Sequence, residues 1–203
     1  MALPIDPDIQ DGPVSEEKDP EEAVLEVAAN LDVPEGYRVQ VIDGRIIVTP
    51  PADGDHAVAL TALMAALLAA GAEEKGLHVV QGLGIYLRPG KKGFAIPDLA
   101  LVDEDFREHQ LPYNCYAPSV FRLVAEVTSS NWRDDTDSKV TAYATVGVPV
   151  YLIADREHGK VLVLTRPHEG AYQSTAEYLP GDKVEIPGDL PCQVAVEKLL
   201  QIR

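Results

Sequence analysis

Hydrophobic residues recur along the chain at spacings that alternate between helical and strand periods. Residues 21–32 predict a short helix that ends before Pro34. Residues 37–50 alternate apolar and polar side chains on both sides of Asp43-Gly44, which predicts a β-hairpin. Residues 56–76 contain no helix breaker before Gly71 and are apolar on nearly every side, so they predict a helix buried against a sheet.

The remaining chain reads as strands separated by two further helices. Strands are predicted over residues 77–82, 83–89, 94–105, 121–130, 148–155, 160–167 and 171–179, and a loop over 106–119. Helices are predicted over 131–147, where Val140, Tyr143, Ala144 and Gly147 have helical spacing, and over 189–201. This order predicts one α/β or α+β domain over residues 21–203, with a mixed central sheet flanked by helices.

The composition is that of a globular domain without a membrane helix. The 203 residues are 46% hydrophobic and 25% charged, and no run of eighteen apolar residues occurs. The first residues lack the basic and apolar regions of a secretory signal. Cys115 and Cys192 form no CxxC pair, which argues against a disulfide framework or zinc site. We therefore expect a cytoplasmic protein.

The net charge of −16 argues at first against nucleic-acid binding, because such a protein repels phosphodiesters at long range. Residues 1–22, however, hold eight acidic residues against Lys18 alone, which leaves −9 on the rest of the chain. Residues 1–20 are rich in Asp, Pro and Glu and predict a disordered acidic arm. The charge therefore does not exclude a nuclease, but DNA binding should be weak without a metal.

Two carboxylates interrupt otherwise apolar strand faces. Alternation places Asp98 on the face of Ile96 and Ala100. Glu126 lies in a strand that is apolar on both faces and therefore central, where an unpaired carboxylate would cost several kcal/mol. Two carboxylates on neighbouring strands suit Mg²⁺ or Mn²⁺. Lys139, in the following helix, is placed to orient water or to stabilise charge on a phosphoryl group.

Each of these residues also has a structural interpretation. Asp98 fits a turn after Pro97, and Glu126 fits an ion pair with Arg122 or Arg133. Lys139 fits a surface ion pair one turn away on its own helix. A serine hydrolase is poorly supported, since no GxSxG motif is present.

Four motifs resemble one family. IPDLALV, LVAEVTSS, the spacing Asp137-x-Lys139-x-x-x-Tyr143, and GVPVYLIAD resemble the putative restriction-endonuclease (Uma-two) family of the PD-(D/E)xK nuclease superfamily, from about Tyr37 to Leu200. The resemblance implies a restriction-endonuclease-like fold and a metal-dependent endonuclease acting on DNA. Asp98 and Glu126 would be metal ligands and Lys139 the catalytic lysine, moved from strand to helix.

The resemblance also implies further site residues and points to departures from the family pattern. The main-chain carbonyl of Val127 would complete the metal site, and the secondary candidates are His56, Gln40, Thr128 and Tyr143. Family members commonly carry glutamate where Gln40 and Val150 stand, and Thr128 occupies a position that carries lysine in many such sites.

Three of the secondary candidates also have a purely structural interpretation. His56 reads as a first-turn surface group, Tyr143 as packing, and Thr128 as the cap of a strand end. The alternative function is an inactive nuclease-like domain that acts in protein interaction or dimerisation. We expect DNA as a partner and no association with a membrane. A homodimer is an open alternative.

Overall fold

The computed structural model describes residues 19–87, 92–128 and 132–201, with the main chain only for 132–136. Most of the predicted acidic arm, residues 1–18, lies outside these ranges. No helix among the described residues is long and apolar enough to cross a membrane.

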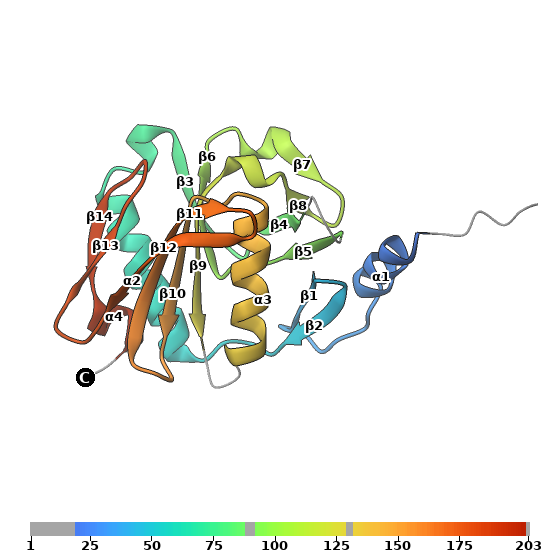
Figure 1. The fold of residues 1–203 in the computed structure, drawn as a ribbon, viewed down its shortest axis with the longest axis horizontal. Helices are drawn as coiled ribbons and strands as arrows, with labels where there is room; N and C mark the ends of the chain where they lie inside the picture. Colours follow the sequence, from blue (N-terminus) through green and yellow to red (C-terminus); the bar gives the residue numbers. More distant parts are fainter. Residues whose placement is uncertain (1–18, 88–91, 129–131, 202–203) are drawn as a thin grey trace, which may run out of the picture.

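A six-stranded mixed sheet forms the centre of the fold (Figure 1). From edge to edge its strands are β12 (Ala171–Tyr178), β11 (Lys160–His168), β10 (Val150–Asp155), β9 (Phe121–Thr128), β6 (Leu99–Asp103) and β3 (Leu77–Gln81). β9 and β10 are parallel, and the other neighbours are antiparallel. Within β9, every residue except Arg122 and Thr128 is buried, so the predicted central strand is confirmed.

A second six-stranded sheet lies beside the first. Its strands, in order, are β2 (Arg45–Thr49), β1 (Arg38–Ile42), β5 (Gly93–Ala95), β4 (Gly84–Leu87), β8 (Cys115–Tyr116) and β7 (Gln110–Leu111). The predicted hairpin is confirmed: Asp43 and Gly44 both have positive φ, as a two-residue turn of this kind requires. The predicted loop over 106–119 is wrong in part, because it contains β7, β8 and the 3₁₀ turns η2 (Phe106–His109) and η3 (Pro118–Val120).

The strand predicted over residues 94–105 is two strands in different sheets. β5 belongs to the second sheet and β6 to the central sheet, and the chain crosses between them at Ile96, Pro97 and Asp98. Proline cannot donate a ladder hydrogen bond, which accounts for the break. Asp98 therefore stands at the junction of the two sheets.

Helices and a small hairpin cover the central sheet in layers (Figure 1). One face packs against α2 (Gly54–Ala69), α4 (Val196–Leu200) and the hairpin of β13 (Lys183–Ile186) and β14 (Cys192–Ala195). The other face packs against α3 (Trp132–Thr145) and the second sheet. α1 (Pro20–Ala29) packs on the outer side of that second sheet, against Val41.

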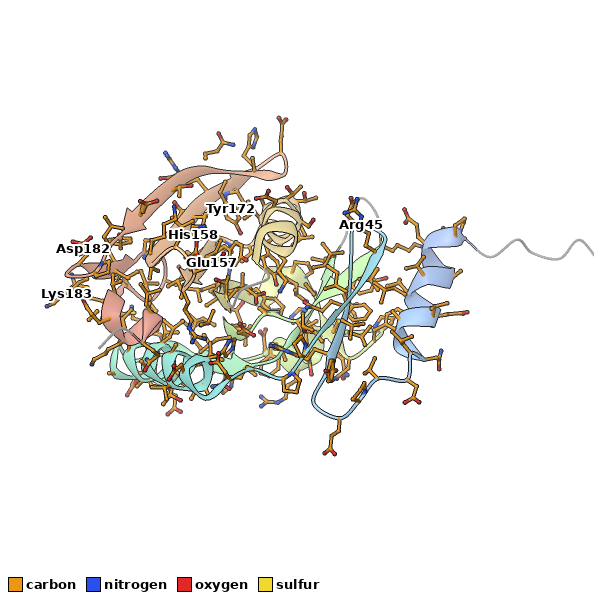
Figure 2. The ribbon with its side chains drawn as sticks, turned by 90° about the horizontal axis from the view of Figure 1, so that it is seen from below. Arg45, Glu157, His158, Tyr172, Asp182 and Lys183 are labelled. Carbon is orange, nitrogen blue, oxygen red and sulfur yellow. The ribbon has the colours of Figure 1, made fainter. Side chains whose placement is uncertain are left out.

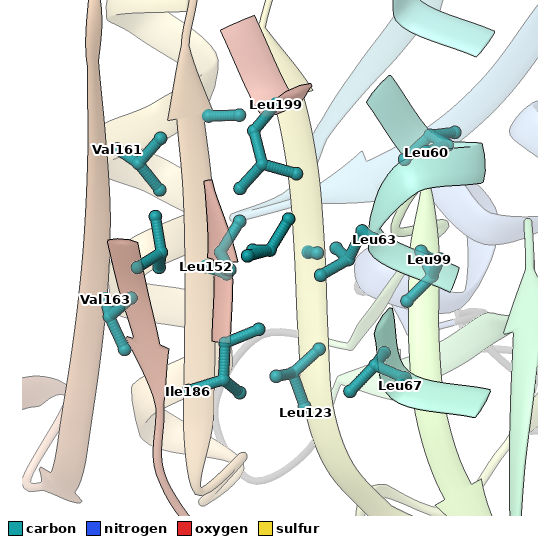
Figure 3. Close-up of a cluster of buried hydrophobic side chains, with 14 of the residues drawn as sticks. Leu60, Leu63, Leu67, Leu99, Leu123, Leu152, Val161, Val163, Ile186 and Leu199 are labelled. Atoms are coloured by element: carbon teal, nitrogen blue, oxygen red, sulfur yellow. The ribbon is translucent and has the colours of Figure 1, made fainter. Parts of the chain in front are cut away.

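Leucines from α2 form the centre of the larger core. Leu60, Leu63 and Leu67 meet Leu99 and Leu123 of the central sheet (Figure 3). The predicted burial of this helix against a sheet is confirmed, although its apolar outer face is uncovered, since Val58 is 53% exposed. Only the stripe that faces the sheet is covered.

The closing helix is shorter than predicted. Residues 192–195 form β14, which pairs with β13, and α4 begins only at Val196. Pairing with β13, which the sequence did not predict as a strand, thus overrides the helix propensity of residues 192–195. Most charged side chains are exposed, for example Arg45 at the turn of the β1 and β2 hairpin and Asp182 and Lys183 near the small hairpin of β13 and β14 (Figure 2).

Candidate active site

A cavity of about 270 Å³ opens where the hairpin of β1 and β2 faces the central sheet. All the site residues predicted from sequence except Tyr143 line it: Asp98, Glu126, Lys139, Val127, His56, Gln40 and Thr128. They come from β1, the first turn of α2, the start of β6, the end of β9, and α3.

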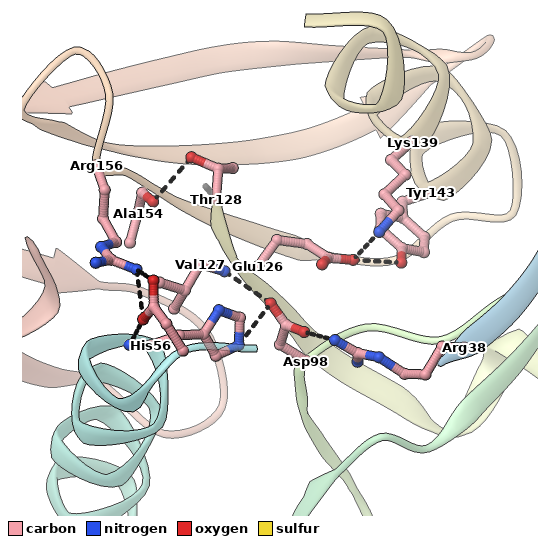
Figure 4. A network of polar contacts seen from close by, with 11 residues as sticks. Arg38, His56, Asp98, Glu126, Val127, Thr128, Lys139, Tyr143, Ala154 and Arg156 are labelled. Atoms are coloured by element: carbon pink, nitrogen blue, oxygen red, sulfur yellow. Dashed lines mark hydrogen bonds and ion pairs between the residues drawn. The ribbon is translucent and has the colours of Figure 1, made fainter. Parts of the chain in front are cut away.

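Asp98 is a buried carboxylate with three donors around it (Figure 4). Its Oδ1 accepts a hydrogen bond from Arg38 Nη2 at 2.7 Å, and its Oδ2 accepts one from the Val127 amide at 3.0 Å. His56 Nε2 lies 3.3 Å from Oδ2. Burial alone would raise the pKa of Asp98, but the contact with His56, the charge of Arg38 and the Val127 N–H outweigh it and lower the pKa to about 2. Asp98 is therefore ionised at neutral pH.

Glu126 is the second buried carboxylate. Its Oε1 accepts hydrogen bonds from Lys139 Nζ at 2.8 Å and from the Tyr143 hydroxyl at 3.1 Å. Among the described residues, none donates a hydrogen bond to Oε2. Burial raises the pKa of Glu126 to about 7, the charge of Lys139 opposes this rise, and the negative charge of Asp98 adds to it.

Strand register brings the two carboxylates together. Leu99 pairs with Ala125 in the antiparallel ladder of β6 and β9, so the next position along each strand places Asp98 beside Glu126. The bond from the Val127 amide to Asp98 extends this pairing past the end of the ladder. The effect of the Asp98 charge on the pKa of Glu126 follows from this proximity.

Lys139 reaches Glu126 from α3 rather than pairing on its own helix. Its side chain is buried, and Tyr143, one turn later, packs edge-on against Tyr151 with ring centroids 5.0 Å apart. Tyr143 is thus a core residue, as expected, and also a hydrogen-bond donor to Glu126. The expected alternative in which Arg122 pairs with Glu126 is wrong, because Arg122 binds Asp103 in two hydrogen bonds of 2.8 and 2.6 Å. The side chain of Arg133 lies outside the described residues.

His56 is buried, so the expectation of a surface group is wrong. Asp53 caps α2 by accepting a hydrogen bond from the His56 amide at 2.7 Å. This cap fixes the start of the helix and aligns His56 with the buried stripe of Ala59, Leu60 and Leu63. The spacing of that stripe is the sequence signal that could have placed His56 inside.

Gln40 and Thr128 have ordinary structural partners as well. Gln40 is 1% exposed, and its Oε1 accepts a hydrogen bond from the Ile96 amide at 2.8 Å. The Thr128 hydroxyl donates to the Ala154 carbonyl at 3.3 Å, which ties the end of β9 to β10. Arg38, which sequence reasoning missed, has its own signal: it lies two residues before Gln40 on the same face of β1.

The donor set fits a hard divalent cation that keeps several waters. No group of three or more His, Cys, Asp and Glu side chains in the described part of the chain is arranged to hold a metal. Mg²⁺ needs only one or two carboxylates, since water and substrate oxygens complete its shell. Asp98 and Glu126 supply these, and their mutual repulsion is the kind that a cation relieves.

The comparisons with known proteins agree with this fold. A search of curated proteins finds no match to this chain. A crystal structure described as a putative nuclease belonging to DUF820, from Anabaena variabilis ATCC 29413, matches 89% of this chain and 97% of its own, with a TM-score of 0.68 and 15% identity. At this identity the likeness shows a shared fold. A family model described as Uma2, putative restriction endonuclease, matches residues 24–199. The chain belongs to the Uma2 family.

Proposed function

We propose that this chain is a divalent-metal-dependent endonuclease that hydrolyses phosphodiester bonds in DNA. The observation that carries the proposal is the meeting of Asp98, Glu126 and Lys139, from three separate elements, in one cavity. The printed description of the family and the fold of the solved neighbour support the same class of activity.

Asp98, the free Oε2 of Glu126 and the Val127 carbonyl would hold Mg²⁺ or Mn²⁺. When bound, such an ion supplies Lewis-acid stabilisation and lowers the pKa of a water molecule. Lys139 Nζ, 2.8 Å from Glu126 Oε1, would stabilise negative charge that develops on a phosphoryl oxygen. Tyr143 holds the same carboxylate oxygen and so fixes its orientation.

We further propose that residues 21–203 act as one nuclease-like domain and that residues 1–20 are an acidic arm outside it. Cys115 and Cys192 are both free thiols, which supports a cytoplasmic location.

Plasmid nicking tests the activity. The full-length chain with Mg²⁺ or Mn²⁺ should nick supercoiled plasmid DNA, and a chelator or Glu126→Ala should abolish nicking. Glu185→Ala, which removes an exposed carboxylate on β13, serves as the matched control and should nick like the wild type. Equal nicking by Glu126→Ala and the wild type would assign the activity to a contaminant and refute the proposal.

The second candidate function is an inactive nuclease-like module that acts through protein contacts. The observation that favours it is the saturation of the carboxylates by protein donors: only Glu126 Oε2 has none among the described residues. Titration calorimetry separates the two functions. A working site should bind Mn²⁺ and lose that binding on Asp98→Ala, whereas an inactive module should give no binding heat.

A further inference from the structure

Three polar side chains share one face of the β1 and β2 hairpin and line the same cavity as the carboxylates. Arg38 and Gln40 are two residues apart on β1 and therefore point to one side of the strand. Thr49 on β2 lies directly across from Arg38 in the ladder, and residues in direct register share a face. Thr49 is not among the proposed metal ligands, whereas Arg38 also pairs with one of them, Asp98.

The Thr49 hydroxyl is a buried polar group without a partner. Among the described residues, it is the one side-chain nitrogen or oxygen almost fully shielded from solvent that makes no hydrogen bond. Buried hydroxyls are almost always satisfied, since an unmade hydrogen bond carries the full cost of desolvation. Because Thr49 lines the cavity, a partner from outside the chain would have to reach this hydroxyl through that space.

Gln40 presents unused donors to the same space. Its Oε1 is fixed because the Ile96 amide can only donate, which turns the Nε2 group away from Ile96. No described residue accepts a hydrogen bond from Nε2, although the side chain is 1% exposed and lines the cavity. Two N–H groups are thus available to a bound molecule.

Arg38 supplies the charge. Its Nη2 contacts Asp98, and its remaining N–H groups have no partner among the described residues. The planar guanidinium carries five donors in a fork that matches phosphate oxygens. At 32% exposure it lies at the mouth of the site and not in its floor.

We propose that Arg38, Gln40 and Thr49 form a subsite for a non-bridging phosphate oxygen of the nucleic-acid strand. The inference rests on the proposed nuclease function and names the residues that position its substrate. The guanidinium and the amide N–H groups can only donate, and the hydroxyl can donate as well, so this face favours an anion over a metal ion. The subsite holds the phosphate beside Glu126 and Lys139, where cleavage would take place.

Duplex binding without cleavage is the test. A short fluorescein-labelled DNA duplex is titrated with the full-length chain in Ca²⁺, and binding is followed by anisotropy. Thr49→Val should weaken binding roughly tenfold, because a hydrogen bond to a charged oxygen is lost. The same variant should unfold at a higher temperature than the wild type, because the unsatisfied hydroxyl is gone. Thr165→Val, a partly buried threonine on β11, is the matched control and should bind DNA like the wild type.

Gln40→Glu provides an independent variant of the same shape. Its carboxylate still accepts from the Ile96 amide but replaces two donors by a negative charge, so duplex affinity measured in a chelator, where no Ca²⁺ can pair with the new carboxylate, should fall at least tenfold. Arg38 variants are less informative, because they also remove the ion pair of Asp98.

The outcomes separate the subsite from the nuclease activity. Wild-type affinity in both Thr49→Val and Gln40→Glu overturns the subsite, even if the wild type cleaves DNA. A loss of both thermal stability and affinity in Thr49→Val makes the hydroxyl a structural group and also overturns it. If the wild type neither binds nor cleaves DNA, calorimetry with inorganic phosphate decides: binding that both variants lose supports the subsite, and no binding by the wild type overturns it.

Discussion

Replacing Glu126 by glutamine should remove a titration near neutral pH from the folding equilibrium. Glu126 is 7% exposed, and burial raises its pKa from 4.5 to about 7 even though Lys139 lies 2.8 Å away. Glutamine has the same shape and keeps an oxygen for Lys139 and Tyr143. The variant therefore changes the charge of the site while leaving its packing intact.

The sign and size follow from the two pKa values. Because the folded state holds the proton more tightly than the unfolded state, the contribution of Glu126 to stability is complete below pH 4.5 and is lost as pH rises through about 7. The shift corresponds to about 3 kcal/mol, most of which falls between about pH 5 and pH 8. Asp98 does not contribute to this difference, because its lowered pKa of about 2 confines its own effect on stability to acid pH.

Urea denaturation in a chelator, at pH 5 and at pH 8, measures this difference. Relative to Glu126→Gln, the wild type should lose about 2 kcal/mol of unfolding free energy between the two pH values. Subtracting the unfolding free energy of the variant from that of the wild type cancels the contribution of the histidines, which both proteins share. Glu108→Gln, which removes an exposed carboxylate, should differ from the wild type equally at both pH values. A constant difference for Glu126→Gln as well would refute the reasoning.

Four further predictions concern the metal and the frame around the site. Mn²⁺ should raise the melting temperature more at pH 8 than at pH 5, because protons compete for Glu126; an equal rise in calorimetric scans would contradict this. Leu63→Ala should cost about 3 kcal/mol in urea denaturation, since Leu63 is fully buried; a cost below about 1 would count against the core described. Asp53→Ala should cost about 1 kcal/mol by the same assay through loss of the α2 cap, and no change would disprove the cap. Gly93→Ala should lower the melting temperature sharply, because its Cβ would strike the Val41 carbonyl, whereas Gly54→Ala, in open space, should not.

The local sequence pattern predicted the helices and strands of this fold better than it predicted which strands pair with each other. The hairpin at Asp43-Gly44 and the doubly apolar strand around Glu126 were recognised because their signals lie within a few residues. The crossing at Pro97 was missed, since alternation along residues 94–105 does not tell which sheet each half joins. β13 and β14 were missed for the same reason, because each is short and gains its stability from the other.

The residues of the site also divide into those that the local pattern predicted and those that it did not. Asp98 and Glu126 were found because an acid on an apolar strand face violates the pattern around it. Arg38 and Thr49 violate nothing, since polar residues are expected on one face of an exposed hairpin. The inward direction of that face follows only from tertiary structure: α1 covers the opposite face through Val41. A helix far from the cavity thus decides which hairpin residues face the carboxylates.

The same geometry resolves the conflict between the acidic chain and a nucleic-acid substrate. The total charge is −16, yet at the cavity the carboxylates of Asp98 and Glu126 face the cations of Arg38 and Lys139, so the charges nearly cancel. A divalent ion bound to the carboxylates would make this patch positive within an acidic protein. Screening limits the opposing long-range field to about 10 Å at 0.1 M salt, so a phosphate that reaches the cavity responds mainly to the local charges. Metal binding should therefore precede and strengthen DNA binding.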